Sequence, residues 1–260
     1  MSSFETLSSP HPNYCPVQWY RMADEKHFWL QWRLRVFMNQ LRDLDLLGRP
    51  FKCLDVGCGN GVLRRQMEKH TAWTIDGADI DESILAEQGN LRGKTYLYNI
   101  DDRRKELQEV YDGLFLFDIL EHLDNPVGFL HSALFHLRPK GWVFINVPAL
   151  PFLYSAYDVM AEHVKRYDLE LLGKELQKAY LENMDSRYWG LSMIPVLGLR
   201  KLLLRKPSLS TLRHGFKPFS ETIHTILKAF MALETRWIGK PLRGTSLMVA
   251  AQKKRNRDID

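Results

Sequence analysis

Cysteine is scarce in this 260-residue sequence, which contains only three. Cys53 and Cys58 flank a glycine-rich stretch, and Cys15 stands among prolines. An odd number of cysteines without zinc-ligand spacing provides neither a disulfide framework nor a zinc site, so we expect a reducing compartment. Cys53 and Cys58 are expected to be small core residues.

Long apolar runs are also missing. No run reaches the roughly 20 residues that a membrane-spanning helix needs. The first residues, MSSFETLSSP, lack the basic and apolar regions of a secretory signal, and we therefore expect a cytoplasmic protein. With 45% hydrophobic and 26% charged residues, the chain is able to bury a large core as one α/β domain.

The net charge of +5 is a mild excess. It is compatible with an acidic substrate, an anionic membrane surface or nucleic acid, and does not choose among them. The sequence contains no repeat of interleaved aromatic and basic residues, a pattern that would indicate RNA binding. We therefore expect no nucleic-acid partner.

The most informative stretch is FKCLDVGCGNGVL, residues 51–63. An apolar run ending in an acid, Asp55, is followed by Gly57, Gly59 and Gly61 and then by apolar residues at helical spacing. This pattern predicts a strand, a tight glycine turn and a helix. Glycine lets the backbone approach a ligand closely, and the helix N-terminus offers free N–H groups, so we expect a nucleotide-type site.

The glycine spacing distinguishes two kinds of nucleotide site. The dinucleotide fingerprint G-x-G-x-x-G/A, counted from Gly57, needs a small residue where Val62 stands, which disfavours an NAD(P)-dependent oxidoreductase. D-x-G-x-G-x-G at a strand end instead resembles motif I of the class I S-adenosylmethionine (SAM) methyltransferases. An acid at Asp55 suits a ligand with a sulfonium and an amino group. A non-catalytic SAM-binding regulatory protein remains an alternative, because its cofactor motifs would look alike.

Apolar segments alternate with helical patterns along the chain, at residues 51–56, 73–78, 95–98, 114–117 and 142–147. This alternation predicts right-handed βαβ units and a doubly wound sheet, with ligands beyond the carboxyl ends of the strands. The resemblance implies an α/β, Rossmann-like sheet of seven strands, mostly parallel, with strand six at 184–189 and an antiparallel last strand at 244–252. The residues at the predicted strand ends are Asp55, Asp79, Asp101, Asp118 and Pro148.

Two acids are candidates for the adenosine half of the cofactor. Asp79 is placed to hold the ribose hydroxyls, with Ile80 against the adenine, while Asp81 caps the next helix. The resemblance implies that Asp101 bonds the adenine amino group. Its alternative role is a helix cap.

Residues 118–126, DILEHLDNP, resemble the segment after the fourth strand of the family. The resemblance implies that Asp118 and Ile119 line the methionine end of the cofactor. Asp118, Glu121 and His122 also resemble a cluster that binds Mg²⁺ in ubiquinone-pathway O-methyltransferases, and oxygen-rich ligands suit this ion. The Glu-His pair of this cluster also occurs in family members that bind no metal, and we predict no metal site.

The run HVKRY, residues 163–167, resembles a loop over the acceptor side in ubiquinone-type methyltransferases. We predict His163 as a general base, with His122 as the second candidate and Asp158 behind them. The alternative is a basic turn that caps a helix over 169–179. Residues 151–168 are predicted to be a loop.

The expected organisation is one methyltransferase domain over 1–260. It comprises a helical N-terminal cap (1–50), a SAM-binding core (51–189 and 244–253) and a helical insertion (190–243). Within the cap, residues 1–18 are expected to be irregular and 19–47 helical, and the EKHFW segment resembles the one that covers the cofactor pocket in the family. The insertion starts apolar and becomes basic through 200–217, which fits an interfacial helix on a membrane, a lid or a dimer face.

The resulting functional hypothesis is methyl transfer from SAM to a small or lipid-linked acceptor, at a hydroxyl oxygen, with S-adenosylhomocysteine (SAH) as the second product. The N/D-P-P-Y/F motif of enzymes that methylate amino groups of nucleic acids is absent, since Ile119, Leu120 and Glu121 follow Asp118. Peripheral membrane contact through 190–217 is part of the hypothesis.

Overall fold

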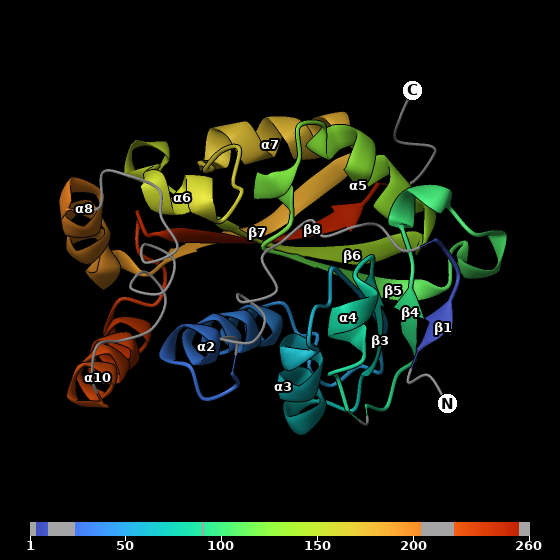
Figure 1. The fold of residues 1–260 in the computed structure, drawn as a ribbon, viewed down its shortest axis with the longest axis horizontal. Coiled ribbons are helices and arrows are strands. Elements are labelled where there is room, and N and C mark those ends of the chain that lie inside the picture. The colour runs from blue at the N-terminus through green and yellow to red at the C-terminus, as the bar shows by residue number, and fades with distance from the viewer. Residues whose placement is uncertain (1–3, 10–23, 90, 204–220, 255–260) are drawn as a thin grey trace.

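A single eight-stranded sheet organises the computed structural model, which describes residues 4–9, 24–89, 91–203 and 221–254. The strand order is β1-β4-β3-β2-β5-β6-β8-β7 (Figure 1). In this order, neighbouring strands from β1 to β6 run parallel, and β8 lies between β6 and β7 and runs antiparallel to both. The strands are β1 (Glu5–Thr6), β2 (Lys52–Val56), β3 (Thr74–Asp79), β4 (Thr95–Leu97), β5 (Tyr111–Phe117), β6 (Leu137–Pro148), β7 (Leu181–Trp189) and β8 (Ser246–Lys253).

This topology confirms the predicted Rossmann-like α/β fold with an antiparallel last strand. The sheet has one strand more than predicted, because Glu5 and Thr6 pair with β4 in a segment that was expected to be irregular. Two residues are too few to give a period-2 pattern. Residues 138–141 lie inside β6 and not in the turn that the Arg-Pro-Lys-Gly sequence suggests.

Helices cover both faces of the sheet (Figure 1). On one face lie α2 (Phe28–Asp43), α3 (Val62–His70) and α4 (Glu82–Leu85), and on the other α5 (Pro126–Phe135) and α7 (Leu169–Lys178). At the end of the sheet where α6 (Ala156–Met160) lies are α8 (Ile194–Leu203) and α10 (Glu221–Trp237). Short 3-10 turns include η1 (Ile100–Asp102), η2 (Lys105–Leu107), η3 (Leu120–His122), η4 (Pro151–Leu153) and η5 (Leu191–Met193).

The central strand β5 is apolar and buried along most of its length, as expected for a parallel strand covered on both faces. Its Phe115 packs against Phe37 of α2 with ring centroids 5.6 Å apart, and Phe144 of β6 completes this aromatic layer. Cys53 and Cys58 are buried free thiols, as predicted, whereas Cys15 lies outside the described residues.

Two helical segments differ from the predictions. Of the predicted helix 19–47, residues 19–23 lie outside the described residues, and in the rest the helix α2 begins at Phe28 and ends at Asp43. His27 caps it by accepting a hydrogen bond from Trp29 N–H. The predicted loop 151–168 contains the short helix α6, because Ser155 and Asp158 form a reciprocal capping box. Within the segment 190–243, which was predicted to be helical, the structure describes α8 and α10 as helices, and residues 204–220 lie outside the described residues.

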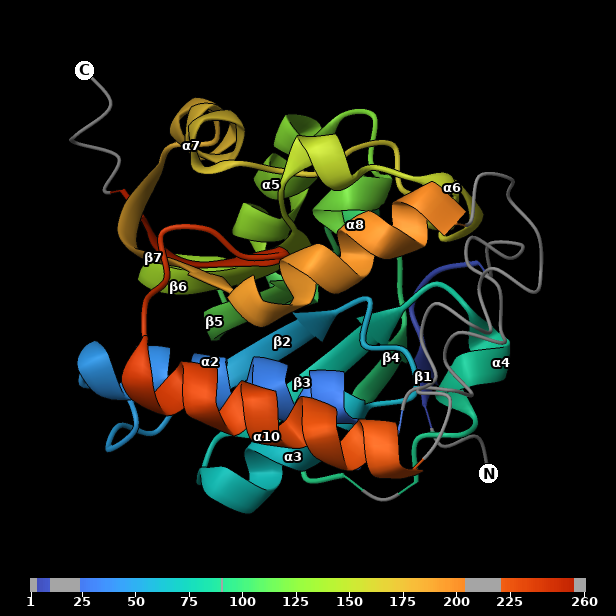
Figure 2. The same ribbon diagram turned by 90° about the vertical axis from the view of Figure 1, so that its left-hand side faces the viewer.

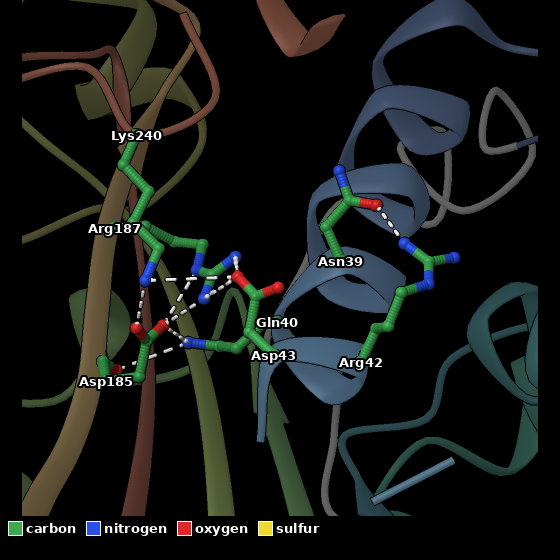
Figure 3. Close-up of polar contacts among 7 residues, drawn as sticks. All are labelled: Asn39, Gln40, Arg42, Asp43, Asp185, Arg187 and Lys240. Atoms are coloured by element: carbon green, nitrogen blue, oxygen red, sulfur yellow. Dashed lines mark hydrogen bonds and ion pairs between the residues drawn. The ribbon is translucent and has the colours of Figure 1, made fainter. Parts of the chain in front are cut away.

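Helix α10 lies beside α2 on the outside of the molecule (Figure 2). A polar network beyond its end joins it to the core: Asp185 of β7 accepts hydrogen bonds from Arg187 at 2.7 Å and from Lys240 at 2.6 Å (Figure 3). Gln40 of α2 donates to the same carboxylate at 2.9 Å, and Asp43 lies 3.3 Å from the buried Arg187. These contacts hold α2, β7 and the segment after α10 together.

Candidate functional site

A cavity of about 250 Å³ opens at the carboxyl ends of β2 and β5. The strand order reverses between these two strands, and open parallel sheets bind ligands at such a point. The wall of the cavity is built from the glycine turn after β2, the residues after β5, and side chains of α2, α6 and α8. The site therefore combines the predicted core with the cap and the insertion.

The glycine turn has the geometry that the sequence predicted. Gly57, Gly59 and Gly61 have φ angles of 66°, 52° and 76°, which side-chain-bearing residues rarely adopt. A Cβ on Gly57 would lie 2.3 Å from the side chain of Ile119, so this position also lacks room for one. Gly57, Gly59 and Ile119 line the cavity, whereas Gly61 lies at the start of α3 and outside the lining.

Asp55 lines the cavity from the end of β2 and is 3% exposed. Burial raises its pKa to about 7, and the positive charges of Arg64 and Arg33 only partly offset this effect. A cationic ligand group beside Asp55 would favour its charged form.

Asp79 is buried at the end of β3, where its carboxylate accepts hydrogen bonds from the N–H of Gly59 at 2.8 Å and of Asp81 at 3.0 Å. Asp79 thus braces the glycine turn and lies outside the cavity lining, as does Ile80. Each carboxylate oxygen retains a second lone pair that a ribose hydroxyl can use. Asp81 caps α4 as predicted, accepting from Ser83 N–H at 2.9 Å.

Asp101 is exposed within η1 and lies outside the cavity lining. Its alternative role as a helix cap is wrong: Asp101 lies inside η1, where Asn99 is the cap and accepts a hydrogen bond from Asp101 N–H at 3.0 Å, and Arg104 holds the cap position of the following η2. A contact between the Asp101 carboxylate and adenine stays a prediction.

Asp118 is the centre of a polar chain at the end of β5. Its backbone is left-handed, with φ of 59°, and its carboxylate accepts from Arg33 at 2.5 Å and from Asn146 at 2.6 Å. Trp189 donates in turn to Asn146 at 3.0 Å. The Nε of Arg33 is buried and finds no hydrogen-bond partner among the described residues, so it fits a ligand oxygen in the cavity.

Sequence reasoning gave Arg33 and Asn146 no individual role. The signal that could have identified Arg33, which is 7% exposed, is an arginine on the apolar side of an aromatic-rich helix. Asn146 had no comparable signal, because an asparagine near a strand end is common.

The predicted acceptor-side residues come together across the cavity from the glycine turn. His163 Nδ1 lies 3.1 Å from Asp158 Oδ1, and Arg166 donates to the same oxygen at 2.7 Å. Burial raises the pKa of Asp158, but the hydrogen bonds and charges of His163 and Arg166 outweigh it and lower the pKa to about 2. The carboxylate favours the proton of His163 on Nδ1, which leaves Nε2 as the proton acceptor.

His122 packs edge-on against His163, with ring centroids 4.9 Å apart. Burial and the neighbouring His163 lower the pKa of His122 to about 4, so His122 is neutral near pH 7. Its Nδ1 lies 3.2 Å from the carbonyl oxygen of Glu162.

The side chains of Glu121, His122 and His163 offer atoms within 4.8 Å of one another and could hold a metal ion. Asp118, which the sequence grouped with Glu121 and His122, is not in this set and pairs with Arg33. Glu121 is 1% exposed, and burial together with the charge of Asp118 raises its pKa well above the usual range.

Comparison with known proteins identifies the family. A family model described as a methyltransferase domain matches residues 20–186. A ubiquinone biosynthesis O-methyltransferase of Hydrogenovibrio crunogenus is 32% identical over 99 residues, which are 36% of this chain and 41% of that protein. One of Pseudomonas savastanoi is 29% identical over 161 residues, which are 57% of this chain and 67% of that protein.

Solved structures share the fold. Phosphoethanolamine N-methyltransferase 2 of Haemonchus contortus, in complex with SAM, superposes with a TM-score of 0.53 and 18% identity over 84% of this chain and 53% of that one. A SAM-dependent methyltransferase of Archaeoglobus fulgidus superposes with a TM-score of 0.52 and 16% identity, over 85% of this chain and 94% of that one. Because the family model covers more than half of the sequence, the chain belongs to the methyltransferase domain family.

Proposed function

We propose that this protein is a SAM-dependent methyltransferase that acts on a hydroxyl oxygen of a small or lipid-linked acceptor. The observation that carries the proposal is that one cavity joins the glycine turn and Asp55 to the His163–Asp158 pair. A cofactor site and a proton acceptor therefore face the same space.

The residues around the cavity fit SAM. The unpartnered Nε of Arg33 suits the carboxylate of the methionine part, and Asp55 suits its ammonium group. Asp118 and Ile119 complete this side. Asp79, Ile80 and Asp101 are proposed for the ribose and adenine, at the neighbouring strand ends.

SAM supplies an electrophilic methyl group on a sulfonium when it is bound. The remaining task of the protein is to align the acceptor and to take its proton, and orientation alone can contribute several kcal/mol. His163 accepts the hydroxyl proton at Nε2, and Asp158 stabilises the resulting imidazolium. We rank His163 above His122, since a group with a pKa of about 4 is a weak proton acceptor near pH 7.

Calorimetric titration with SAH and with NADH tests the cofactor. We expect SAH to bind and NADH not to. Binding of NADH without SAH would overturn the proposal in favour of the oxidoreductase.

A second assay separates an enzyme from a regulatory protein. Methyl-labelled SAM is incubated with a panel of hydroxyl compounds and a cell extract, and the label should pass to an acceptor.

The division into cap, core and insertion is also part of the proposal. In the insertion, α8 and α10 expose apolar side chains and lie at the end of the sheet that carries α6 (Figure 2). The cavity reaches this insertion through Leu197 and Arg200 of α8.

We further propose that the insertion touches an anionic membrane surface at the cytoplasmic side. Leu202 and Leu203 of α8 are 65% and 70% exposed, next to the basic Lys201, and Trp237 of α10 is 76% exposed. Apolar side chains beside basic ones suit an anionic lipid interface. Residues 204–217 of the predicted contact lie outside the described residues. Within the described part of the chain, no helix is long and apolar enough to span a bilayer.

Flotation with vesicles tests this contact. The protein should float with phosphatidylglycerol-containing vesicles and not with neutral ones, and Leu202→Ser with Leu203→Ser should weaken flotation. No binding to anionic vesicles would dismiss the contact. Light scattering that shows a dimer in the wild type and a monomer in the variant would assign the same face to self-association.

A further inference from the structure

Arg64 of α3 is an arginine that the solvent does not reach, since it is 0% exposed. Gly77 of β3 leaves the space for its guanidinium, because a Cβ there would lie 2.6 Å from Nη1 of Arg64. A guanidinium carries five N–H donors, and here each donor has an acceptor. The acceptors, at 2.7 to 3.0 Å, are the carbonyl oxygens of Ile75, Gly93 and Lys94, Oε1 of Gln88 and Oγ1 of Thr95. The orientation of this side chain is therefore fixed.

Arg64 in turn fixes the carboxamide of Gln88, which follows α4 and is 3% exposed. Because a guanidinium has only donors, the atom of Gln88 that faces it at 2.7 Å is the carboxamide oxygen. The amide nitrogen consequently points to the glycine turn. There it donates hydrogen bonds to the carbonyl oxygen of Gly59 and, at 3.0 Å, to Sγ of Cys58.

Gly59 is thereby held at both of its backbone polar groups. Its N–H donates to Asp79 at 2.8 Å, and its carbonyl oxygen accepts from Gln88. Gly59 lines the cavity, whereas Gln88 and Arg64 do not. A glycine loses more conformational freedom than any other residue when it is ordered. Contacts that order it in the empty protein reduce the entropy that a ligand would otherwise lose on binding.

We propose that Gln88, oriented by Arg64, is a positioning residue for the cofactor and holds the Gly59 peptide in the conformation that binds SAM and SAH. This inference rests on the proposed function and adds to it two residues outside the cavity. Since Gln88 acts through the backbone of the glycine turn, its loss should weaken cofactor binding. Proton transfer at His163, on the opposite side of the cavity, does not depend on this contact.

Calorimetry of SAH binding to the full-length protein tests the contact. Gln88→Met keeps the length of the side chain and removes its donor, and the Kd of SAH should rise about tenfold, because the turn then has to be ordered on binding. Thr95→Val is the matched control, since it removes one acceptor of Arg64 and leaves the bond from Gln88 to Gly59 in place. This control should lower stability in urea unfolding and keep the Kd within about twofold of the wild type.

Amide hydrogen exchange distinguishes positioning from a general loss of stability, and its first measurement needs no variant. In the wild type without ligand, the amide of Gly59 should exchange at least about tenfold more slowly than in an unstructured peptide. In Gln88→Met this amide should exchange about fivefold faster or more than in the wild type. The amides of the central strand β5 should differ little between Gln88→Met and Thr95→Val.

Three results would overturn the inference. They are an unchanged Kd of SAH in Gln88→Met, an equal rise of the Kd in Thr95→Val, and unprotected exchange of the Gly59 amide in the wild type. If the wild type does not bind SAH, the proposed function fails, and this inference fails with it. If the wild type binds SAH and Gln88→Met binds it as tightly, only this inference fails.

Discussion

Asp55 carries a pKa of about 7 in the folded protein against 3.8 ordinarily, because it is buried. The folded state therefore binds more protons than the unfolded state between about pH 4 and pH 7. By linkage, this group lowers stability as the pH rises through that window. In the protein without ligand, ionisation of this buried carboxylate therefore costs folding stability at neutral pH.

Asp55→Asn should accordingly stabilise the protein without ligand at pH 8. One pKa unit corresponds to about 1.4 kcal/mol, so the gain is at most about 4 kcal/mol. It should vanish below about pH 4, where the carboxyl is protonated in both states. Urea unfolding at pH 4 and pH 8 measures the difference. Asp45→Asn, at a side chain that is 96% exposed, is the control and should change little. A variant less stable than the wild type at pH 8 would contradict the argument.

SAH binding should depend on the same titration. The ionised carboxylate favours the ammonium group of the ligand, so affinity should rise between pH 5.5 and 7.5 as Asp55 loses its proton. The variant Asp55→Asn should bind SAH more weakly and without this rise. Calorimetry in buffers of different ionisation enthalpy should also detect proton release on binding to the wild type near pH 7. A pH-independent affinity in the wild type would remove Asp55 from contact with the ligand.

The histidine pair makes a separate prediction about turnover. His163→Ala should lower kcat on the true acceptor by about 10²- to 10⁴-fold, the usual contribution of a general base. SAH affinity should stay within about twofold, since the loss concerns proton transfer. His122→Ala should cost less, because His122 is neutral and weakly basic near pH 7. His131→Ala, at an exposed position of α5, serves as the control. Unchanged turnover in His163→Ala would exclude it as the base.

At the scale of elements, Glu234 fixes the insertion to the core. Its buried carboxylate accepts hydrogen bonds from the N–H groups of Gly190 at 2.8 Å, Leu191 at 3.0 Å and Ser192 at 2.8 Å. These are the first residues after β7, where the backbone turns into η5 and then α8. One side chain of α10 therefore sets the start of the element that carries Arg200.

Glu234→Ala should destabilise the protein by about 2 kcal/mol or more, because buried N–H groups lose their acceptor. It should also raise the KM of the acceptor while leaving SAH affinity nearly unchanged, since α8 lines the acceptor side. Urea unfolding and steady-state kinetics measure the two effects. Glu170→Ala, at an exposed acid of α7, is the matched control. Equal losses for SAH and acceptor would show that the insertion does not act on the acceptor side selectively.

For the whole molecule, ligand binding should couple to global stability. A ligand at 100 times its Kd stabilises the folded state by about 2.7 kcal/mol. For a chain of this size that corresponds to a rise in Tm of roughly 5 to 10 °C. SAH should produce such a shift in a thermal scan, and NADH at the same concentration should not. No shift with SAH at concentrations far above its measured Kd would mean that the ligand binds the unfolded chain as well.

Much of the architecture follows from local sequence. The strand predicted at 51–56, which is β2 (Lys52–Val56), the glycine turn and α3 were predicted because apolar periodicity and the need for positive φ are readable within one short stretch of sequence. The parallel order with an antiparallel last strand was predicted through the family resemblance. The boundaries of α2 and the short helix α6 were not, since they depend on the caps at His27 and Ser155.

The sequence by itself determined the glycine turn, the alternation of strands and helices, and the acids at the strand ends, since each depends on neighbouring residues. The tertiary structure alone decided what those acids contact. Arg33 reaches Asp118 across 85 positions of sequence, and Glu234 reaches Gly190 across 44. It also brought Arg200 into the cavity, because α8 follows η5, whose first backbone N–H groups are held by Glu234 of α10. Such contacts produce no periodic pattern in the sequence, because their partners are set by the packing of whole elements.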